Sequence, residues 1–86
     1  MNLAKTMNLE EALNKNMPVH VVYEYSTKEI VGWYPFGEKL AELDAENRCN
    51  RNGPDTYSFA KWEHYVNIRE RHQKHLAQLE EIERRL

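Results

Sequence analysis

The sequence predicts an α+β domain with a small antiparallel sheet of two or three strands, short helices and one long C-terminal helix. Residues 19–25 and 30–36 are rich in β-branched and aromatic residues and flank a polar turn, which is typical of a β-hairpin. Residues 56–86 contain neither Gly nor Pro and carry apolar residues at helical spacing, which indicates one helix. A chain of 86 residues has room for one domain. We therefore expect a head over 1–54, continuous with a long helix over 55–86.

Composition and charge exclude several classes of protein. Hydrophobic residues make up 41% of the chain, which is too many for a disordered protein. Twelve Lys and Arg against fourteen Asp and Glu give a net charge of −2, so no strong overall field attracts nucleic acid or an anionic membrane. Cys49 is the single cysteine, which rules out a disulfide within the chain. With no signal-peptide pattern and no apolar run of the ~20 residues that span a bilayer, we predict a cytoplasmic protein without membrane contact.

The first predicted element is a short helix over residues 9–13. Asn8 precedes it as a cap, and the two carboxylates Glu10 and Glu11 in its first turn suit the helix dipole. Pro18 disfavours helical geometry at the residue before it. The helix is therefore expected to end before Pro18.

The predicted hairpin has a definite register. A four-residue turn over 26–29 sets Tyr25 opposite Ile30 and Val21 opposite Tyr34. Three apolar residues then share the face opposite the main aromatic face: Val22, Val31 and Trp33. If a helix covers that face, these residues are plain core, which is the favoured interpretation; if the face is open, it is a protein-recognition patch.

Residues 38–43 fit either a third strand or the start of a helix. We favour the strand, followed by a short helix over 45–50 that Asp44 caps. The sequence Arg51–Asp55, Arg-Asn-Gly-Pro-Asp, is turn chemistry at nearly every position, and it separates the head from the long helix.

The long helix carries a heptad seam that predicts a partner helix. Its members are Tyr65, Ile68, His72, His75, Leu79, Ile82 and Leu86, with Leu76 beside them. The helix is longer than its own head can cover, so the second half of the seam, with His72, His75, Leu79 and Ile82, is expected to bind another helix. We predict a homodimer. For the two seam histidines, partly solvated side chains on the helix surface are the favoured interpretation, ahead of a pH-dependent contact between the two copies. A metal at His72 and His75 is the less favoured reading because no third ligand is evident, so neither metal nor cofactor is predicted.

The same helix contains a basic run, Arg69 to His75. Arg69, Arg71 and Lys74 are candidates for phosphate contacts, while Glu70 and the later glutamates favour a solvated helix face. We include Arg69 and Arg71 among the predicted partner-binding residues. Nucleic acid is possible as a partner but is not favoured.

Catalytic motifs are absent from the sequence. It has no Gly-x-Ser-x-Gly, no P-loop, no His-Glu-x-x-His and no Cys-x-x-Cys. We therefore predict that the protein is not an enzyme and assign no catalytic residue.

The stretch Ile30–Asn50, with its expected strand, turn, second strand and short helix, resembles small phage-encoded accessory proteins, which act in host takeover or against host defence. Such proteins bind and block one host protein. The resemblance implies a non-enzymatic inhibitor or adaptor of phage or mobile-element origin. The alternative is a small nucleic-acid-associated regulator or antitoxin that uses the basic stretch of the C-terminal helix.

Overall fold

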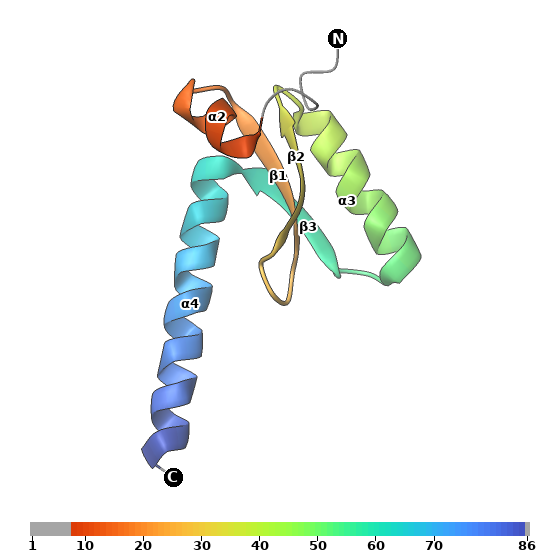
Figure 1. Ribbon diagram of the computed structural model, residues 1–86. Coiled ribbons are helices and arrows are strands. Elements are labelled where there is room, and N and C mark those ends of the chain that lie inside the picture. Colours follow the sequence, from red (N-terminus) through yellow and green to blue (C-terminus); the bar gives the residue numbers. More distant parts are fainter. Residues whose placement is uncertain (1–7, 86) are drawn as a thin grey trace.

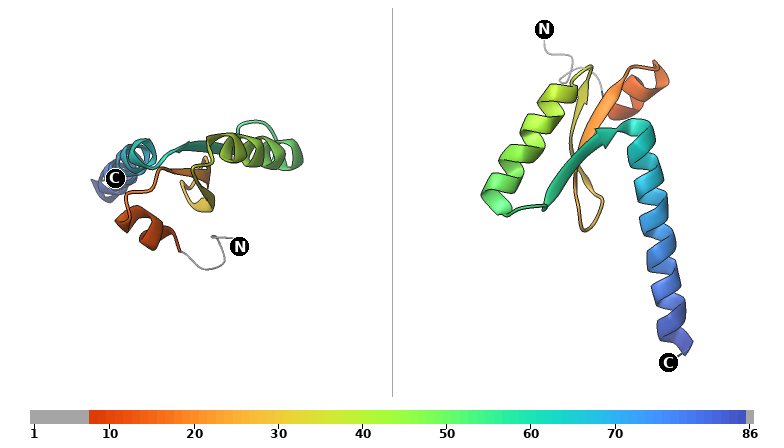
Figure 2. Two further views of the ribbon diagram at one scale, coloured as in Figure 1. Left: turned by 90° about the horizontal axis from the view of Figure 1, so that it is seen from above. Right: turned by 180° about the vertical axis from the view of Figure 1, so that it is seen from behind.

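The computed structural model describes residues 8–85 and confirms the α+β class. Its elements are, in chain order, α2 (Leu9–Asn14), β1 (Val19–Glu24), β2 (Ile30–Pro35), α3 (Glu38–Asn52), β3 (Tyr57–Lys61) and α4 (Trp62–Arg85). The three strands form one antiparallel sheet in the order β2-β1-β3. Helix α3 covers one face of the sheet, and α2 and α4 lie on the other (Figures 1 and 2). Leu86 of the predicted seam lies outside the described residues.

Helix α2 forms as the sequence predicts. The Asn8 side-chain oxygen accepts a hydrogen bond from the Glu11 amide at 2.8 Å, which satisfies one of the free N–H groups at the start of the helix. The helix ends at Asn14, and Asn16 turns the chain with a φ of 57°. Asparagine tolerates this left-handed conformation better than most residues, so the turn into β1 carries little strain.

The hairpin is confirmed, but the predicted register is wrong. Tyr23 pairs with Ile30, Val21 pairs with Trp33, and Val31 is the extra residue of a bulge in β2. A bulge inserts one residue into a ladder in which successive side chains alternate between faces. All residues of β2 beyond Val31 therefore lie on the face opposite to the one predicted, and Trp33 moves to the face of Val21.

The third strand of the sheet is Tyr57–Lys61 and not residues 38–43. The preference for a strand over 38–43 is wrong, as is the short helix capped by Asp44, because one helix runs from Glu38 to Asn52. The expected helical start at residue 56 is also wrong, since α4 begins only at Trp62. Residues 57–59 are half-buried, with Phe59 packed against the α3 core, Ala60 is buried on the other face, and the strand pairs with the free edge of β1. That pairing gives hydrogen-bond partners to the backbone N–H and C=O groups along the free edge of β1. This gain outweighs the tendency of these residues to continue the helix that follows them.

Two small cores hold the layers together. The first lies between the sheet and the pair α2 and α4, and its buried members are Ala12, Val19, Val21, Tyr23, Ala60 and Tyr65. The second lies between the sheet and α3, and its buried members are Val22, Ala41 and Ala45. Tyr65 joins the first core to the hairpin turn, because its ring centroid lies 5.3 Å from that of Tyr23 and its hydroxyl donates to the Lys28 carbonyl oxygen.

Helix α4 extends well past the rest of the molecule (Figure 1). Its 24 residues make a rod ~36 Å long, and the described chain measures 56 × 32 × 19 Å. The radius of gyration is 15.2 Å, against ~12 Å for a compact domain of this length. Within residues 8–85, no helix is both long and apolar enough to cross a bilayer.

Two tyrosines predict how stability depends on alkaline pH. The hydrogen bond to Asp44 and burial raise the pKa of Tyr34 above its ordinary value of 10.0, and burial raises the pKa of Tyr65 above the same value. A phenol whose pKa is raised by folding keeps its full contribution below the unfolded pKa and loses it as the pH rises through the folded pKa. We expect the free energy of unfolding to fall above pH ~10, and urea titrations between pH 8 and pH 11.5 measure it. In Tyr34→Phe and Tyr65→Phe the fall should be smaller, and an unchanged profile in both variants contradicts the assignment.

Candidate protein-interaction surfaces

The predicted patch of Val22, Val31 and Trp33 is not formed. Val22 is fully buried beneath α3, and Val31 is half-buried on the same face. Trp33 lies on the opposite face, where it packs against the core formed with α2 and α4. The bulge at Val31 separates Trp33 from the other two residues. Their role as partner-binding residues stays a prediction that this arrangement does not favour.

An exposed apolar patch lies instead at the start of α3. It consists of Phe36, Leu40 and Leu43, and we call it the Phe36 patch. Phe36 is 71% exposed and Leu40 57% exposed, while the small residues Ala41 and Ala45 of the same helix are buried. A surface helix normally turns its larger apolar side chains toward the core. Helix α3 does the reverse, so its outward face presents the larger apolar side chains to solvent.

The backbone at Phe36 is strained. Its φ of 56° is in the left-handed region, which is unusual for a bulky side chain. The Phe36 amide donates to the Pro18 carbonyl oxygen at 2.8 Å, and this bond holds the corner between β2 and α3. A Cβ at Gly37 would lie only 2.6 Å from Cβ of Tyr34, so the next position accommodates no side chain. The corner is tightly fixed, and it projects an aromatic ring into solvent.

The surroundings of the Phe36 patch are acidic. The first nine residues of α3 carry three carboxylates away from the sheet, on Glu38, Glu42 and Glu46, and one amine, on Lys39, while the Asp44 carboxylate faces β2. Lys39 pairs with Glu42 at 3.8 Å across the exposed surface. An apolar patch with an acidic rim is complementary to an apolar surface with a basic rim.

A partly buried polar cluster fixes α3 against the sheet and so positions the patch. The Asp44 carboxylate accepts from the Tyr34 hydroxyl at 2.5 Å and from Nε of Arg48 at 2.7 Å. Arg48 also donates to the Val31 carbonyl oxygen at 3.3 Å. Gly32 makes room for this carboxylate, because a Cβ there would lie 3.0 Å from Asp44 Oδ2. Asp44 therefore joins the bulge of β2 to the middle of α3.

The predicted seam of α4 divides into two parts at His72. Tyr65 is buried and Ile68 packs against the head, while His72 is half-buried. Beyond His72 the seam residues are exposed: His75, Leu76, Leu79 and Ile82. The structure therefore brings the predicted residues of the second half onto one free stripe of helix.

The predicted basic residues do not form a continuous surface. Arg69, Arg71 and Lys74 are all exposed, but residues two apart in an α-helix lie about 200° apart around its axis. Arg69 and Arg71 therefore flank the seam on opposite sides. Within the described chain, no group of three His, Cys, Asp or Glu side chains is placed to hold a metal ion.

A groove separates the hairpin turn from α4. Its volume is about 380 Å³, and it is lined on one side by Thr27 to Ile30 and on the other by Tyr65, Arg69, His72, Gln73 and Leu76. The groove opens alongside the point where the free part of the seam begins.

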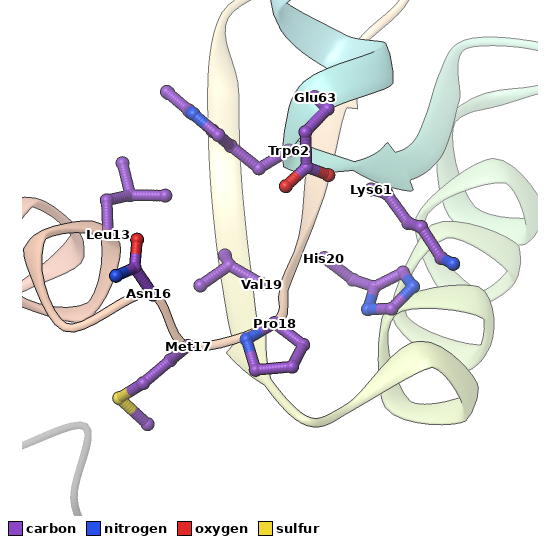
Figure 3. A pocket seen from close by; sticks show the side chains of 9 residues that line it. All are labelled: Leu13, Asn16, Met17, Pro18, Val19, His20, Lys61, Trp62 and Glu63. Carbon is purple, nitrogen blue, oxygen red and sulfur yellow. The ribbon is translucent and has the colours of Figure 1, made fainter.

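A second cavity of about 460 Å³ lies where α2, β1 and the β3–α4 junction meet (Figure 3). Lys61 pairs with His20 across the sheet, and the His20 side chain is 7% exposed with no hydrogen-bond partner for either ring nitrogen among residues 8–85. Because both nitrogens are buried, a molecule in the cavity cannot reach them unless the surrounding side chains move. A molecule in the cavity would therefore make no hydrogen bond to the His20 ring in this conformation.

The Phe36 patch was missed by sequence reasoning, and one signal was available. A helix over 38–52 places Ala41 and Ala45 on one face and Leu40 and Leu43 on another, which a helical projection of the sequence would have shown. The positive φ of Phe36 had no such signal, since no glycine or asparagine marks it.

The chain matches no protein-family model, and no curated protein or solved structure is significantly similar to it.

Proposed function

We propose that this protein is a non-enzymatic protein-binding module, acting as a small inhibitor or adaptor, and that the Phe36 patch is its binding surface. The observation that carries the proposal is Phe36 itself, a bulky residue that is held in left-handed backbone and is 71% exposed. This conformation costs ~1–2 kcal/mol, and exposing the ring forgoes the stabilisation that burial would give. Strain of this kind tends to lie at functional sites.

The partner is expected to present an apolar ridge or pocket with basic residues around it. Phe36 and Leu40 supply the apolar area, and aromatic side chains that enter a partner's pocket dominate many protein interfaces. The carboxylates at the start of α3 steer a basic rim toward the patch. The resemblance to phage accessory proteins supports a host protein as the partner, and the lone Cys49 is in keeping with a reducing cytoplasm.

Replacing Phe36 by asparagine is expected to stabilise the fold and abolish partner binding together. Asparagine accepts the left-handed conformation, so the free energy of unfolding should rise by about 1 kcal/mol, or Tm by about 4–8 °C. Thermal unfolding measures the first effect. Affinity capture from a bacterial lysate, with captured proteins quantified against the wild type, measures the second.

The matched control is Tyr25→Ser, which removes another exposed aromatic ring at the far end of the sheet. It should leave capture unchanged. Leu40→Ser, which alters the patch without touching the strained backbone, should reduce capture. If Phe36→Asn and Leu40→Ser capture the same proteins in the same amounts as the wild type, the Phe36 patch is not the binding surface.

A further inference from the structure

We propose that two copies of this chain pair through α4 in antiparallel orientation, about a two-fold axis at the level of Ala77. This interface is separate from the Phe36 patch and does not depend on it. It assigns the occupant of the free seam, which is a second copy of the same seam.

The hairpin turn determines how much of α4 is free for pairing. The turn contacts the helix at Tyr65, whose hydroxyl donates to the Lys28 carbonyl oxygen, and Ile68 packs against the head. From His72 onward the seam lies beside the hairpin turn at His72 and Leu76, which line the groove, and it is otherwise exposed, with Ile82 at 55%. The free part, 72–82, is about one and a half heptads long.

One antiparallel register places apolar residues of each copy against the seam of the other. In antiparallel coiled coils, residues of the two seam positions face each other. Here His72 faces the partner's Ile82, and His75 faces the partner's Leu79. Leu76, beside the seam, meets the partner's Leu76 across the two-fold axis. Every layer then contains at least one aliphatic side chain.

Charge along α4 favours this orientation over the parallel one. Residues 69–75 carry three basic side chains and one acidic one, whereas residues 80–83 carry three carboxylates. Antiparallel pairing sets Arg69 opposite the partner's Glu83 on both sides of the dimer. Arg71 approaches the partner's Arg85, but that guanidinium is already paired with Glu81 at 2.8 Å. Parallel pairing would instead stack like-charged segments and set His72 against the partner's His72, which is unfavourable.

The groove beside the hairpin turn fits the end of the partner helix. Arg69, His72 and Leu76 line its α4 wall, and Ile30 lines the opposite wall. In the proposed register the partner's Ile82 enters the mouth of the groove next to His72, and the partner's Glu83 reaches Arg69. The groove residues thus supply an apolar contact for the partner's Ile82 and an opposite charge for the partner's Glu83.

The first experiment locates the interface. Leu79→Glu should convert the protein to a monomer in sedimentation equilibrium. Ala77→Glu adds the same charge two residues away on the opposite side of the helix and should remain dimeric. If the wild type is monomeric at all concentrations, or if both variants behave alike, the pairing through this seam is refuted while the proposal for the Phe36 patch is unaffected.

The second experiment tests the antiparallel register through charge. Arg69→Glu and Glu83→Arg each create two like-charged contacts in the proposed homodimer, so each should weaken dimerisation by about tenfold. A mixture of the two variants restores opposite charges at both contacts, and the mixed dimer should exceed the half expected from random pairing. The control mixture of Glu70→Arg with Lys74→Glu, on the outer side of the helix, should pair at random. Random pairing in both mixtures overturns the register.

The third experiment reads the orientation directly. Gln78→Cys and Arg85→Cys are each made in a Cys49→Ser background, because Cys49 is the only native thiol. In the antiparallel dimer the two copies of position 78 face each other, whereas the two copies of position 85 lie ~24 Å apart along the helix axis. A short bis-maleimide should therefore cross-link Gln78→Cys and not Arg85→Cys. Equal cross-linking at both positions shows a parallel dimer and refutes the antiparallel arrangement.

Discussion

Replacing Tyr65 by alanine is expected to lower the free energy of unfolding by about 3–5 kcal/mol. The side chain is 2% exposed, and its ring centroid lies 5.3 Å from that of Tyr23 and 5.7 Å from that of Trp62. The alanine variant loses these aromatic contacts and leaves a cavity. It also loses the hydroxyl that binds the Lys28 carbonyl oxygen, so α4 and the hairpin turn are no longer joined.

A small domain has little stability to spare, so Tyr65→Ala is expected to be largely unfolded at 25 °C, which circular dichroism and urea titration measure. Tyr65→Phe separates the two contributions, because it keeps the ring and loses only the hydrogen bond. Its expected cost is about 1 kcal/mol. If Tyr65→Ala costs no more than Tyr65→Phe, the ring does not form the core that we describe.

Replacing Asp44 by alanine should have the second largest effect, with a loss of about 2 kcal/mol. The Asp44 carboxylate binds both the Tyr34 hydroxyl and the Arg48 guanidinium, and its side chain is 14% exposed. Without it, two partly buried donors lose their acceptor, and the guanidinium keeps its charge without a counterion. The variant should remain folded but should unfold at a lower urea concentration.

Two comparisons make the Asp44 prediction specific. Glu42→Ala removes a partner from the exposed 3.8 Å ion pair with Lys39 in the same helix, and it should cost less than ~0.5 kcal/mol. A double-mutant cycle of Asp44→Ala with Tyr34→Phe should show a coupling of about 1 kcal/mol. Strictly additive effects would mean that the short contact between these two side chains contributes nothing to stability.

The fold class was predictable from the sequence because its signals are local. Two runs of β-branched and aromatic residues, separated by a polar turn, predict a hairpin, and a long stretch without Gly or Pro predicts a helix. Asn8 signals a helix start through its own side chain. Each of these features depends on residues close together in the chain, so no knowledge of packing is needed.

The errors share a cause, which is competition between distant segments. Residues 57–61 look helical beside the sequence that follows, yet they become β3 because β1 has an unpaired edge forty residues earlier in the chain. The bulge at Val31 is decided by how the hairpin packs against both layers. Residues 38–43 join the longer helix α3 once the third strand comes from elsewhere. In each case tertiary contact outweighed local propensity.

The candidate surfaces also differ in whether local sequence or distant contacts determine them. The free seam of α4 was predictable, since heptad spacing and helix length are visible in the sequence. The Phe36 patch was not, because its exposure depends on which face of α3 the sheet covers and on a backbone corner held by Pro18. The predicted patch is not formed because the bulge at Val31 places Trp33 on the opposite face of the sheet.

The length of α4 beyond His72 has a consequence for its dynamics. This segment is largely exposed, with the hairpin turn beside it only near Gln73 and Leu76, and an isolated helix of ~12–15 residues is only marginally stable in water. Its amide protons should therefore exchange with solvent far faster than those of β1, which is buried between both layers. Pairing would have to order this segment as well as join it, so part of the association free energy would be used for helix formation. Dimerisation would then be coupled to local folding, and the helical fraction of α4 would increase with protein concentration.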